Sequence, residues 1–125
     1  LVLFMGVFYH LRHPLLALDI VAAKVSRRLI FQTMVMPGEQ VEIPPQDFSL
    51  DQRERLTRPG WPKMAFIERR LAGDPTNWWV PNHAAVEAML RSCGLRVVQR
   101  PGEEIYVCEP EPGGEREVAG PPKRN

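Results

Sequence analysis

The stretch LVLFMGVFYH (residues 1–10), followed by LRHP (residues 11–14), decides the fold of this chain. Val2 to Met5 are apolar and predict a short buried strand, and Pro14 suits the first turn of a helix, where its missing N–H is tolerated. A strand that leads through Gly-Val-aromatic-Tyr-His into a helix predicts a crossover at the ligand-facing edge of a sheet. No methionine, helix cap or polar segment precedes the strand, so we expect the chain to begin in the middle of a fold.

The residues that follow predict a helix and a second strand. Pro14 to Ala23 are apolar nearly all round, so we expect a helix that is covered on most of its sides. Leu29 to Met36 form a near-continuous apolar run, which is typical of a buried strand. Strand, helix and strand at this spacing predict a parallel pair joined by a right-handed crossover.

The second half of the chain predicts another helix and a β-hairpin. Residues 82–93 place apolar side chains at i, i+3, i+4 and i+7, and these are Val86, Met89, Leu90 and Cys93. Gly94 supplies the helix stop. Leu95 to Gln99 and Ile105 to Cys108 predict the two strands of a hairpin, with its turn at Pro101-Gly102.

Residues 37 to about 80 form an insert that is rich in proline and tryptophan. Its turn signals separate two stretches that we predict as short helices, Leu50 to Leu56 and Met64 to Leu71. A loop of this length is uncommon in a compact domain unless it is functional. We therefore expect one domain over residues 1–108, which contains the insert, and a disordered Pro/Gly-rich tail over residues 109–125.

Composition narrows the class of protein. The 125 residues, of which 44% are hydrophobic, suffice for one domain, and a net charge of +1 lacks the basic footprint of a general nucleic-acid-binding protein. The longest apolar run is far shorter than the roughly 20 residues that cross a bilayer, and it lacks the basic start of a signal peptide. Cys93 and Cys108 lie in apolar patterns and are predicted to be core residues. We expect a cytoplasmic protein without a membrane partner.

Common catalytic motifs are absent from the sequence. It contains no G-x-G-x-x-G, no phosphate-binding loop, no G-x-S-x-G and no recognisable Ser-His-Asp or Cys-His set. His10 and His13 are three residues apart, but no Cys or carboxylate close in sequence completes a ligand set. We therefore predict no metal site, since two histidines alone do not hold zinc.

One segment resembles a known family. MGVFYH (residues 5–10), with Pro14-Leu15 after it, resembles the fourth-strand segment of class I S-adenosylmethionine-dependent methyltransferases. It is similar in particular to the group of the tRNA wobble-uridine carboxymethyltransferases, which reads Met-Gly-Val-Leu-Tyr-His there. The resemblance continues through Thr33-Met34-Val35, Trp79-Val80-Pro81-Asn82 and residues 89–95, so it covers about residues 1 to 100.

This resemblance implies a Rossmann-like α/β sheet with strand order 3-2-1-4-5-7-6, in which strand 7 is antiparallel. The chain would hold strands 4, 5, 6 and 7 with two crossover helices, and strands 1–3 would be missing. Those strands carry the glycine-rich cofactor loop and the acidic residue that binds the ribose. The cofactor of the complete enzyme would be S-adenosylmethionine or its carboxylated form, and we expect this chain alone neither to bind it tightly nor to catalyse the transfer.

The resemblance also implies roles for individual residues. Met5, Gly6 and Tyr9 would line the cofactor pocket, with the Tyr9 ring near the sulfonium, although Met5 fits the core equally well. Tyr9 and His10 are the catalytic candidates. His10 would accept a proton from the substrate, but we favour a loop-fixing hydrogen bond for it.

The remaining candidates would contact the methyl acceptor. Arg12 would meet an anionic substrate, with an ordinary exposed arginine as the favoured alternative. Trp78 and Trp79 are expected to divide, one packing under the insert and one at the mouth of the site, because neighbours in an extended chain point oppositely.

Three functions remain open at this point. The first is part of a methyltransferase that transfers a methyl or carboxymethyl group to a small molecule or a tRNA, inactive without its first half. The second is a non-catalytic remnant that associates with itself or another chain through the exposed strand at Val2 to Met5. The third, a nucleic-acid-binding module, has no support from the composition.

Overall fold

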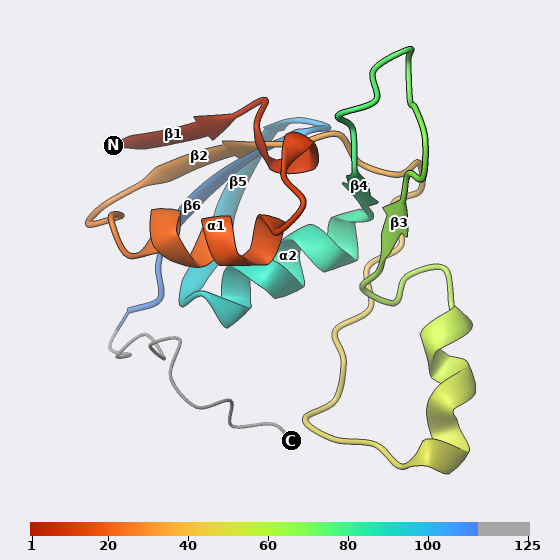
Figure 1. Cartoon of the computed structure of the whole chain (residues 1–125). Helices are drawn as coiled ribbons and strands as arrows, with labels where there is room; N and C mark the ends of the chain where they lie inside the picture. Colours follow the sequence, from red (N-terminus) through yellow and green to blue (C-terminus); the bar gives the residue numbers. More distant parts are fainter. Residues whose placement is uncertain (113–125) are drawn as a thin grey trace.

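The structure is a computed structural model, and it describes residues 1–112. Its main feature is a mixed sheet of four strands (Figure 1). The strands are β1 (Val2–Met5), β2 (Leu29–Gln32), β5 (Leu95–Gly102) and β6 (Ile105–Pro110), and they lie in the order β1-β2-β6-β5. β1 and β2 are parallel, as predicted, whereas β6 is antiparallel to both of its neighbours. The fold is therefore mixed α/β.

Alternation along the strands gives the sheet one covered and one open face. Phe4, Phe31 and Tyr106 are aligned across β1, β2 and β6, and all three are buried in the core. Leu3 and Ile30 are aligned one residue earlier and point to the opposite face, where Leu3 is 62% exposed. The prediction of a buried first strand is therefore correct only for the face that carries Phe4.

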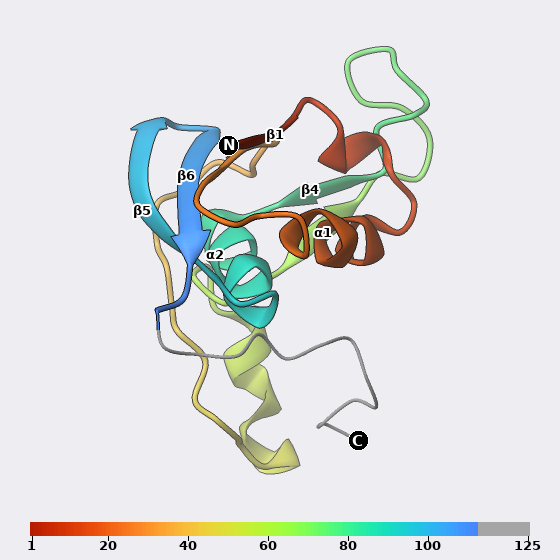
Figure 2. The same cartoon turned by 90° about the vertical axis from the view of Figure 1, so that its left-hand side faces the viewer.

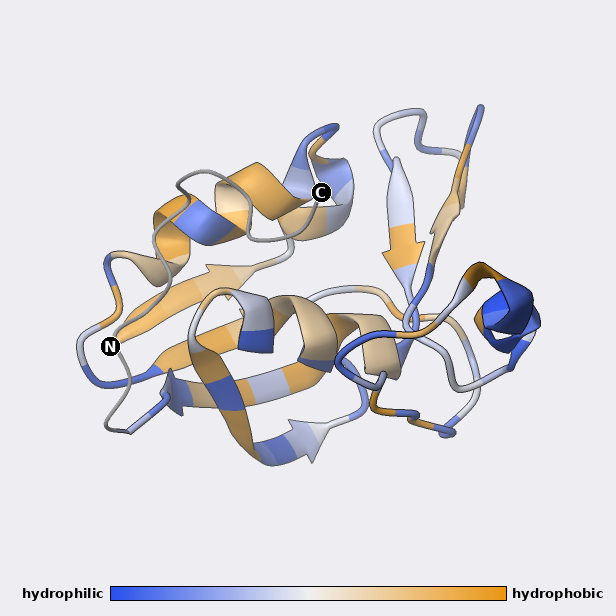
Figure 3. Cartoon of the chain, turned by 90° about the horizontal axis from the view of Figure 1, so that it is seen from below, coloured by the Kyte–Doolittle hydropathy of each residue, from blue (hydrophilic) through white to orange (hydrophobic). Residues whose placement is uncertain are grey.

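The helices α1 (Pro14–Ala22) and α2 (His83–Ser92) lie on the same side of the sheet (Figure 1). Leu18 of α1 and Leu90 of α2 are fully buried in the shared core. Hydrophobic residues run along most of α1 in Figure 3, yet the outer side of this helix is open, with Leu15, Leu16 and Ile20 at 46%, 60% and 57% exposure. The expectation that α1 is covered on most sides is wrong, because the described part of the chain supplies packing partners on one side only.

Asn82 joins the start of α2 to the insert. Its side-chain oxygen accepts hydrogen bonds from the amides of Ala85 (2.8 Å) and Lys63 (3.1 Å), and its amide group donates to the Trp61 carbonyl (2.7 Å). One side chain therefore caps the helix and holds the preceding loop. The helix ends where predicted, before Gly94, which has a φ of +80°.

The insert contains a short hairpin and a 3₁₀-helix. β3 (Met64–Phe66) pairs antiparallel with β4 (Trp79–Pro81) as a second sheet, so the prediction of a helix over 64–71 is wrong. Pairing with a distant strand outweighs the weak helical tendency of so short a segment. The other predicted helix exists as the 3₁₀-helix η2 (Leu50–Thr57), which lies away from the four-stranded sheet in Figures 1 and 2.

Element boundaries differ from the predictions where backbone groups find other partners. β2 ends at Gln32 rather than Met36, whose amide instead donates to the Pro81 carbonyl at 2.7 Å. The hairpin turn lies at Glu103-Glu104 rather than at Pro101-Gly102. Strand β6 continues to Pro110, beyond the predicted domain limit at 108, and the rest of the predicted tail, residues 113–125, lies outside the described residues.

Both cysteines are buried, as predicted, and neither forms a disulfide. Burial raises the pKa of the Cys108 thiol to about 12, which keeps it protonated. Over residues 1–112, no helix is both long enough and apolar enough to cross a membrane.

Candidate functional site

The carboxyl ends of β1 and β2 meet at one edge of the sheet. Met5 and Gln32 end the two strands as partners in the register. Gly6, at a φ of +70°, turns the chain there, and a Cβ atom on it would stand 3.7 Å from the Tyr9 hydroxyl and 3.8 Å from the Gln32 side-chain oxygen. The carboxyl edge, where α/β proteins bind ligands, thus brings Met5, Gly6 and Tyr9 together with Gln32, a residue that sequence reasoning did not select.

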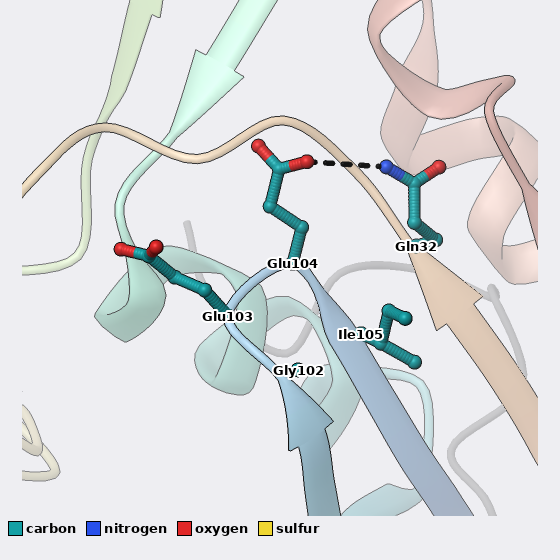
Figure 4. A pocket seen from close by; sticks show the side chains of 5 residues that line it. All are labelled: Gln32, Gly102, Glu103, Glu104 and Ile105. Atoms are coloured by element: carbon teal, nitrogen blue, oxygen red, sulfur yellow. Dashed lines mark hydrogen bonds between the residues drawn. The ribbon is translucent and has the colours of Figure 1, made fainter.

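A shallow depression opens beside Gln32. It has a volume of about 380 Å³ and is lined by Gln32, Gly102, Glu103, Glu104 and Ile105 (Figure 4). Glu104 points toward Gln32, whose amide donates a long hydrogen bond of 3.5 Å to the carboxylate. A ligand would remain largely in solvent there, whereas small-molecule sites enclose most of the ligand surface.

A single turn of 3₁₀-helix, η1 (Phe8–His10), positions the two catalytic candidates. Phe8 is fully buried and packs edge-to-face on Phe31, with ring centroids 5.3 Å apart, so the turn is anchored in the core. Tyr9 is half-buried, and its ring centroid lies 4.6 Å from that of His10.

His10 has a hydrogen-bond partner in the insert. Its Nδ1 lies 3.0 Å from the Thr76 hydroxyl oxygen and 3.1 Å from the Thr76 carbonyl oxygen. The Thr76 hydroxyl and amide both donate to Asp74, at 2.6 and 2.8 Å, and these bonds lower the Asp74 pKa. Because the threonine hydroxyl proton goes to Asp74, the histidine donates from Nδ1, and in the neutral imidazole Nε2 is then the acceptor nitrogen.

This arrangement supports the favoured, loop-fixing role of His10 without testing its catalytic one. The Nδ1 contact joins η1 to a segment 66 residues away in the sequence. Among residues 1–112, Nε2 makes no hydrogen bond in the structure, so the acceptor nitrogen of a base is present as well. Proton transfer by His10 stays a prediction.

Arg12 and the two tryptophans lie together next to η1. The Arg12 guanidinium is 4.8 Å from the centroid of the Trp78 ring, and the Trp79 indole N–H donates to the Arg12 carbonyl at 3.3 Å. The predicted division of the tryptophans is not seen, since both rings contact Phe66, with centroid distances of 6.4 and 5.0 Å. Alternation does not separate them because Trp78 precedes the first residue of β4.

A second polar group is buried under the sheet and was not predicted. The Tyr106 hydroxyl and Nδ1 of His83 share a hydrogen bond, and the Arg100 guanidinium lies 2.9 Å from the same nitrogen and 3.3 Å from Nε2. Burial and the charge of Arg100 lower the pKa of His83, and burial raises the pKa of Tyr106 to about 12. The contacts of His83 with Tyr106 and Arg100 join α2 to the β5–β6 hairpin, which is a structural task.

Sequence reasoning missed three further residues of the carboxyl edge and the insert. Gln32 carries a usable signal, because a polar residue that ends an apolar strand marks the ligand-facing edge. Thr76 and Phe66 carry none, since their contacts depend on the pairing of distant segments. Over residues 1–112, no three His, Cys, Asp or Glu side chains are grouped so as to hold a metal ion.

Comparison with known proteins assigns no family. No protein-family model matches the chain, and no curated protein matches its sequence.

Proposed function

We propose that this chain is part of a class I S-adenosylmethionine-dependent methyltransferase that transfers a methyl or carboxymethyl group. The observation that carries the proposal is the strand order β1-β2-β6-β5, with β6 antiparallel to both neighbours. The same order and directions belong to strands 4-5-7-6 of the sheet that the MGVFYH resemblance implies. Sequence motif and topology both support this assignment.

In this assignment the sulfonium group of the donor lies past the carboxyl end of β1. Tyr9 is half-buried there, beside Gly6 and Gln32. Its ring face would attract the sulfonium by a cation–π interaction of about 0.5–2 kcal/mol. Methyl transfer further requires that nucleophile, methyl group and sulfur lie in line, so the anchoring of η1 by Phe8 would contribute through alignment.

The free edge of β1 supports the view that further strands complete the donor site. β1 is a terminal strand of the described sheet, with Leu3 62% exposed. Leu16 and Ile20 are exposed on the outer side of the neighbouring helix α1. Strands paired with β1 would complete its free edge, and elements packed on the open face of the sheet and on α1 would bury these side chains. In the family such strands carry the glycine-rich cofactor loop. We infer that the 125-residue chain binds the donor weakly on its own.

The test is calorimetric titration with S-adenosylmethionine. It compares the 125-residue chain with the protein translated from the whole reading frame that contains it. We expect no measurable heat from the first and micromolar binding by the second. Tyr9→Ala should weaken this binding about 2- to 30-fold, and Tyr9→Phe, which keeps the ring face, should weaken it less. Absence of binding by the longer protein, or equal binding by all variants, would overturn the proposal.

A second candidate is a non-catalytic protein that associates through β1. The exposed Leu3 on a terminal strand favours it, because unpaired apolar edges recruit other strands. Analytical ultracentrifugation should then show a concentration-dependent dimer, and Leu3→Lys should make it monomeric. A wild-type chain that stays monomeric at high concentration excludes self-association through β1.

A further inference from the structure

The end of the insert holds the ring of His10 through one of its two nitrogens. Nδ1 lies 3.0 Å from the Thr76 hydroxyl oxygen and 3.1 Å from the Thr76 carbonyl oxygen, while Nε2 makes no hydrogen bond within residues 1–112. The buried His83 differs, because the Arg100 guanidinium lies 2.9 Å from its Nδ1 and 3.3 Å from its Nε2. Of these two histidines, His10 is therefore the one that is fixed through one nitrogen and keeps the other available.

Asp74 determines the direction of the hydrogen bond between His10 and Thr76. A threonine hydroxyl can donate to a histidine or accept from it, so this hydroxyl alone would be compatible with either histidine tautomer. The Thr76 hydroxyl lies 2.6 Å from Oδ1 of Asp74, which also accepts from the Thr76 amide at 2.8 Å. These bonds and the nearby charge of His10 lower the pKa of Asp74, so that it is a carboxylate at neutral pH and only accepts. With the hydroxyl proton directed to Asp74, both Thr76 oxygens accept from Nδ1–H.

The loop that carries Asp74 is itself held in place. Leu71 and Asp74 exchange main-chain hydrogen bonds of 3.3 and 3.0 Å. The side chain of Asn77, which is only 5% exposed, donates to the Leu71 carbonyl at 2.9 Å. The Trp78 amide donates to the Tyr9 carbonyl at 2.7 Å and so connects the loop to the turn after β1. These supporting contacts are what a group that orients another side chain requires.

We propose that Asp74 and Thr76 are positioning residues that hold His10 as its Nδ1–H tautomer, with Nε2 as a proton acceptor. The logic is that of a base oriented by a third group. In the proposed transfer, the attacking oxygen or nitrogen of the acceptor bonds to the transferred carbon, the carbon–sulfur bond breaks with its electron pair on sulfur, and the proton of the acceptor passes to Nε2. The use of the proton rests on the proposed function, whereas the tautomer does not depend on it.

The first experiment measures the tautomer of each histidine by long-range ¹H–¹⁵N NMR. It uses the ¹⁵N-labelled 125-residue chain without S-adenosylmethionine, above about pH 8, where histidines are neutral. The chain has three histidines, and His10→Gln and His13→Gln assign the signals. We expect His10 to be mainly Nδ1–H, and the exposed His13 to show the Nε2–H form that a free histidine side chain prefers. A His10 that is mainly Nε2–H overturns the inference.

Asp74→Ala frees the Thr76 hydroxyl to donate to Nδ1 of His10. It should lower the ratio of the Nδ1–H to the Nε2–H form about 2- to 10-fold, which corresponds to one hydrogen bond. Adding Thr76→Val removes the competing hydroxyl and leaves the carbonyl, so the double variant should regain the Nδ1–H form. An unchanged ratio in Asp74→Ala, or a double variant that does not regain this form, overturns the role of Asp74. Asp47→Ala is the matched control, because Asp47 also accepts from a main-chain amide of the insert, at 2.8 Å, and it should leave the ratio unchanged.

A second experiment separates a proton acceptor from a contact that only fixes the loop. Diethyl pyrocarbonate acylates a histidine through a free nitrogen lone pair, and mass spectrometry gives the rate at each histidine. We expect His10 to react at a rate similar to that of His13, and Asp74→Ala to slow this reaction in proportion to the lost Nδ1–H population. A His10 that is Nδ1–H but does not react overturns the inference. Neither experiment uses the donor, so a failure of the methyltransferase proposal would be distinguishable from a failure of this one.

Discussion

The main-chain amide of Trp78 donates a 2.7 Å hydrogen bond to the carbonyl of Tyr9. Together with the contact between His10 and Thr76, it joins the turn after β1 to the end of the insert. The insert and the turn are therefore one structural unit. We expect substitutions in the insert to change the local stability of the candidate catalytic residues Tyr9 and His10.

Thr76→Val tests this coupling. It removes the hydroxyl that accepts from His10 and donates to Asp74. We expect a loss of stability of about 1 kcal/mol or less, since these groups are exposed, but faster amide hydrogen exchange in residues 9–11. Thr57→Val removes a comparable exposed hydroxyl bond, to Glu54 in η2, and should leave exchange in residues 9–11 unchanged.

Gly6→Ala tests the turn itself. The added Cβ would have ordinary contacts, 3.7 and 3.8 Å, but at a φ of +70° an L-residue is strained. We expect a destabilisation of about 1–2 kcal/mol in urea unfolding. Gly102→Ala is the control, because this glycine does not need a positive φ, and it should be neutral or slightly stabilising. Equal effects of the two substitutions would contradict the proposed turn geometry.

Asn82→Ala should lower the free energy of unfolding by more than the usual contribution of a helix cap. Loss of the cap costs about 1 kcal/mol, and the loss also leaves the Lys63 amide and the Trp61 carbonyl without their partner. We expect about 2–3 kcal/mol in total, measured by chemical denaturation. Ser49→Ala, at the exposed N-terminus of η2, should cost less than about 1 kcal/mol.

Stability should fall as the pH drops below about 6.5, the ordinary pKa of histidine. The pKa of His83 is lowered in the folded chain by burial and by Arg100, while Glu103, Glu87 and Glu39 partly oppose this. Between the folded and the unfolded pKa the unfolded chain binds more protons, so acid favours unfolding there and stability is fully present above that window. Urea unfolding between about pH 5 and 8 should show this slope, His83→Gln should reduce it, and His13→Gln should not.

Local patterns were sufficient for the elements whose stability depends on their own residues. The strand at Val2–Met5 and the helix from Pro14 have the predicted bounds to within one residue. The helix after Asn82 follows from its apolar spacing and its cap. The candidate residues Tyr9, His10 and Arg12 could be selected because they directly follow a strand end.

Patterns failed where a segment depends on a distant partner. Met64–Phe66 forms a strand because its backbone pairs with that of β4. The local sequence of this segment does not indicate this pairing. The ring contacts of Phe66 with Trp78 and Trp79 also depend on the pairing of distant segments. The same holds for the hydrogen bond between His83 and Tyr106.

By itself, the sequence determined the α/β class, the first strand, both helices and the carboxyl-edge turn with Tyr9, because periodicity, capping and glycine act over a few residues. Only the tertiary structure decided the pairing of β3 with β4, the exposed side of α1 and the grouping of Phe66, Trp78 and Trp79 next to Arg12. Those features depend on contacts between residues far apart in the chain, whose entropy cost is offset only when the whole core forms.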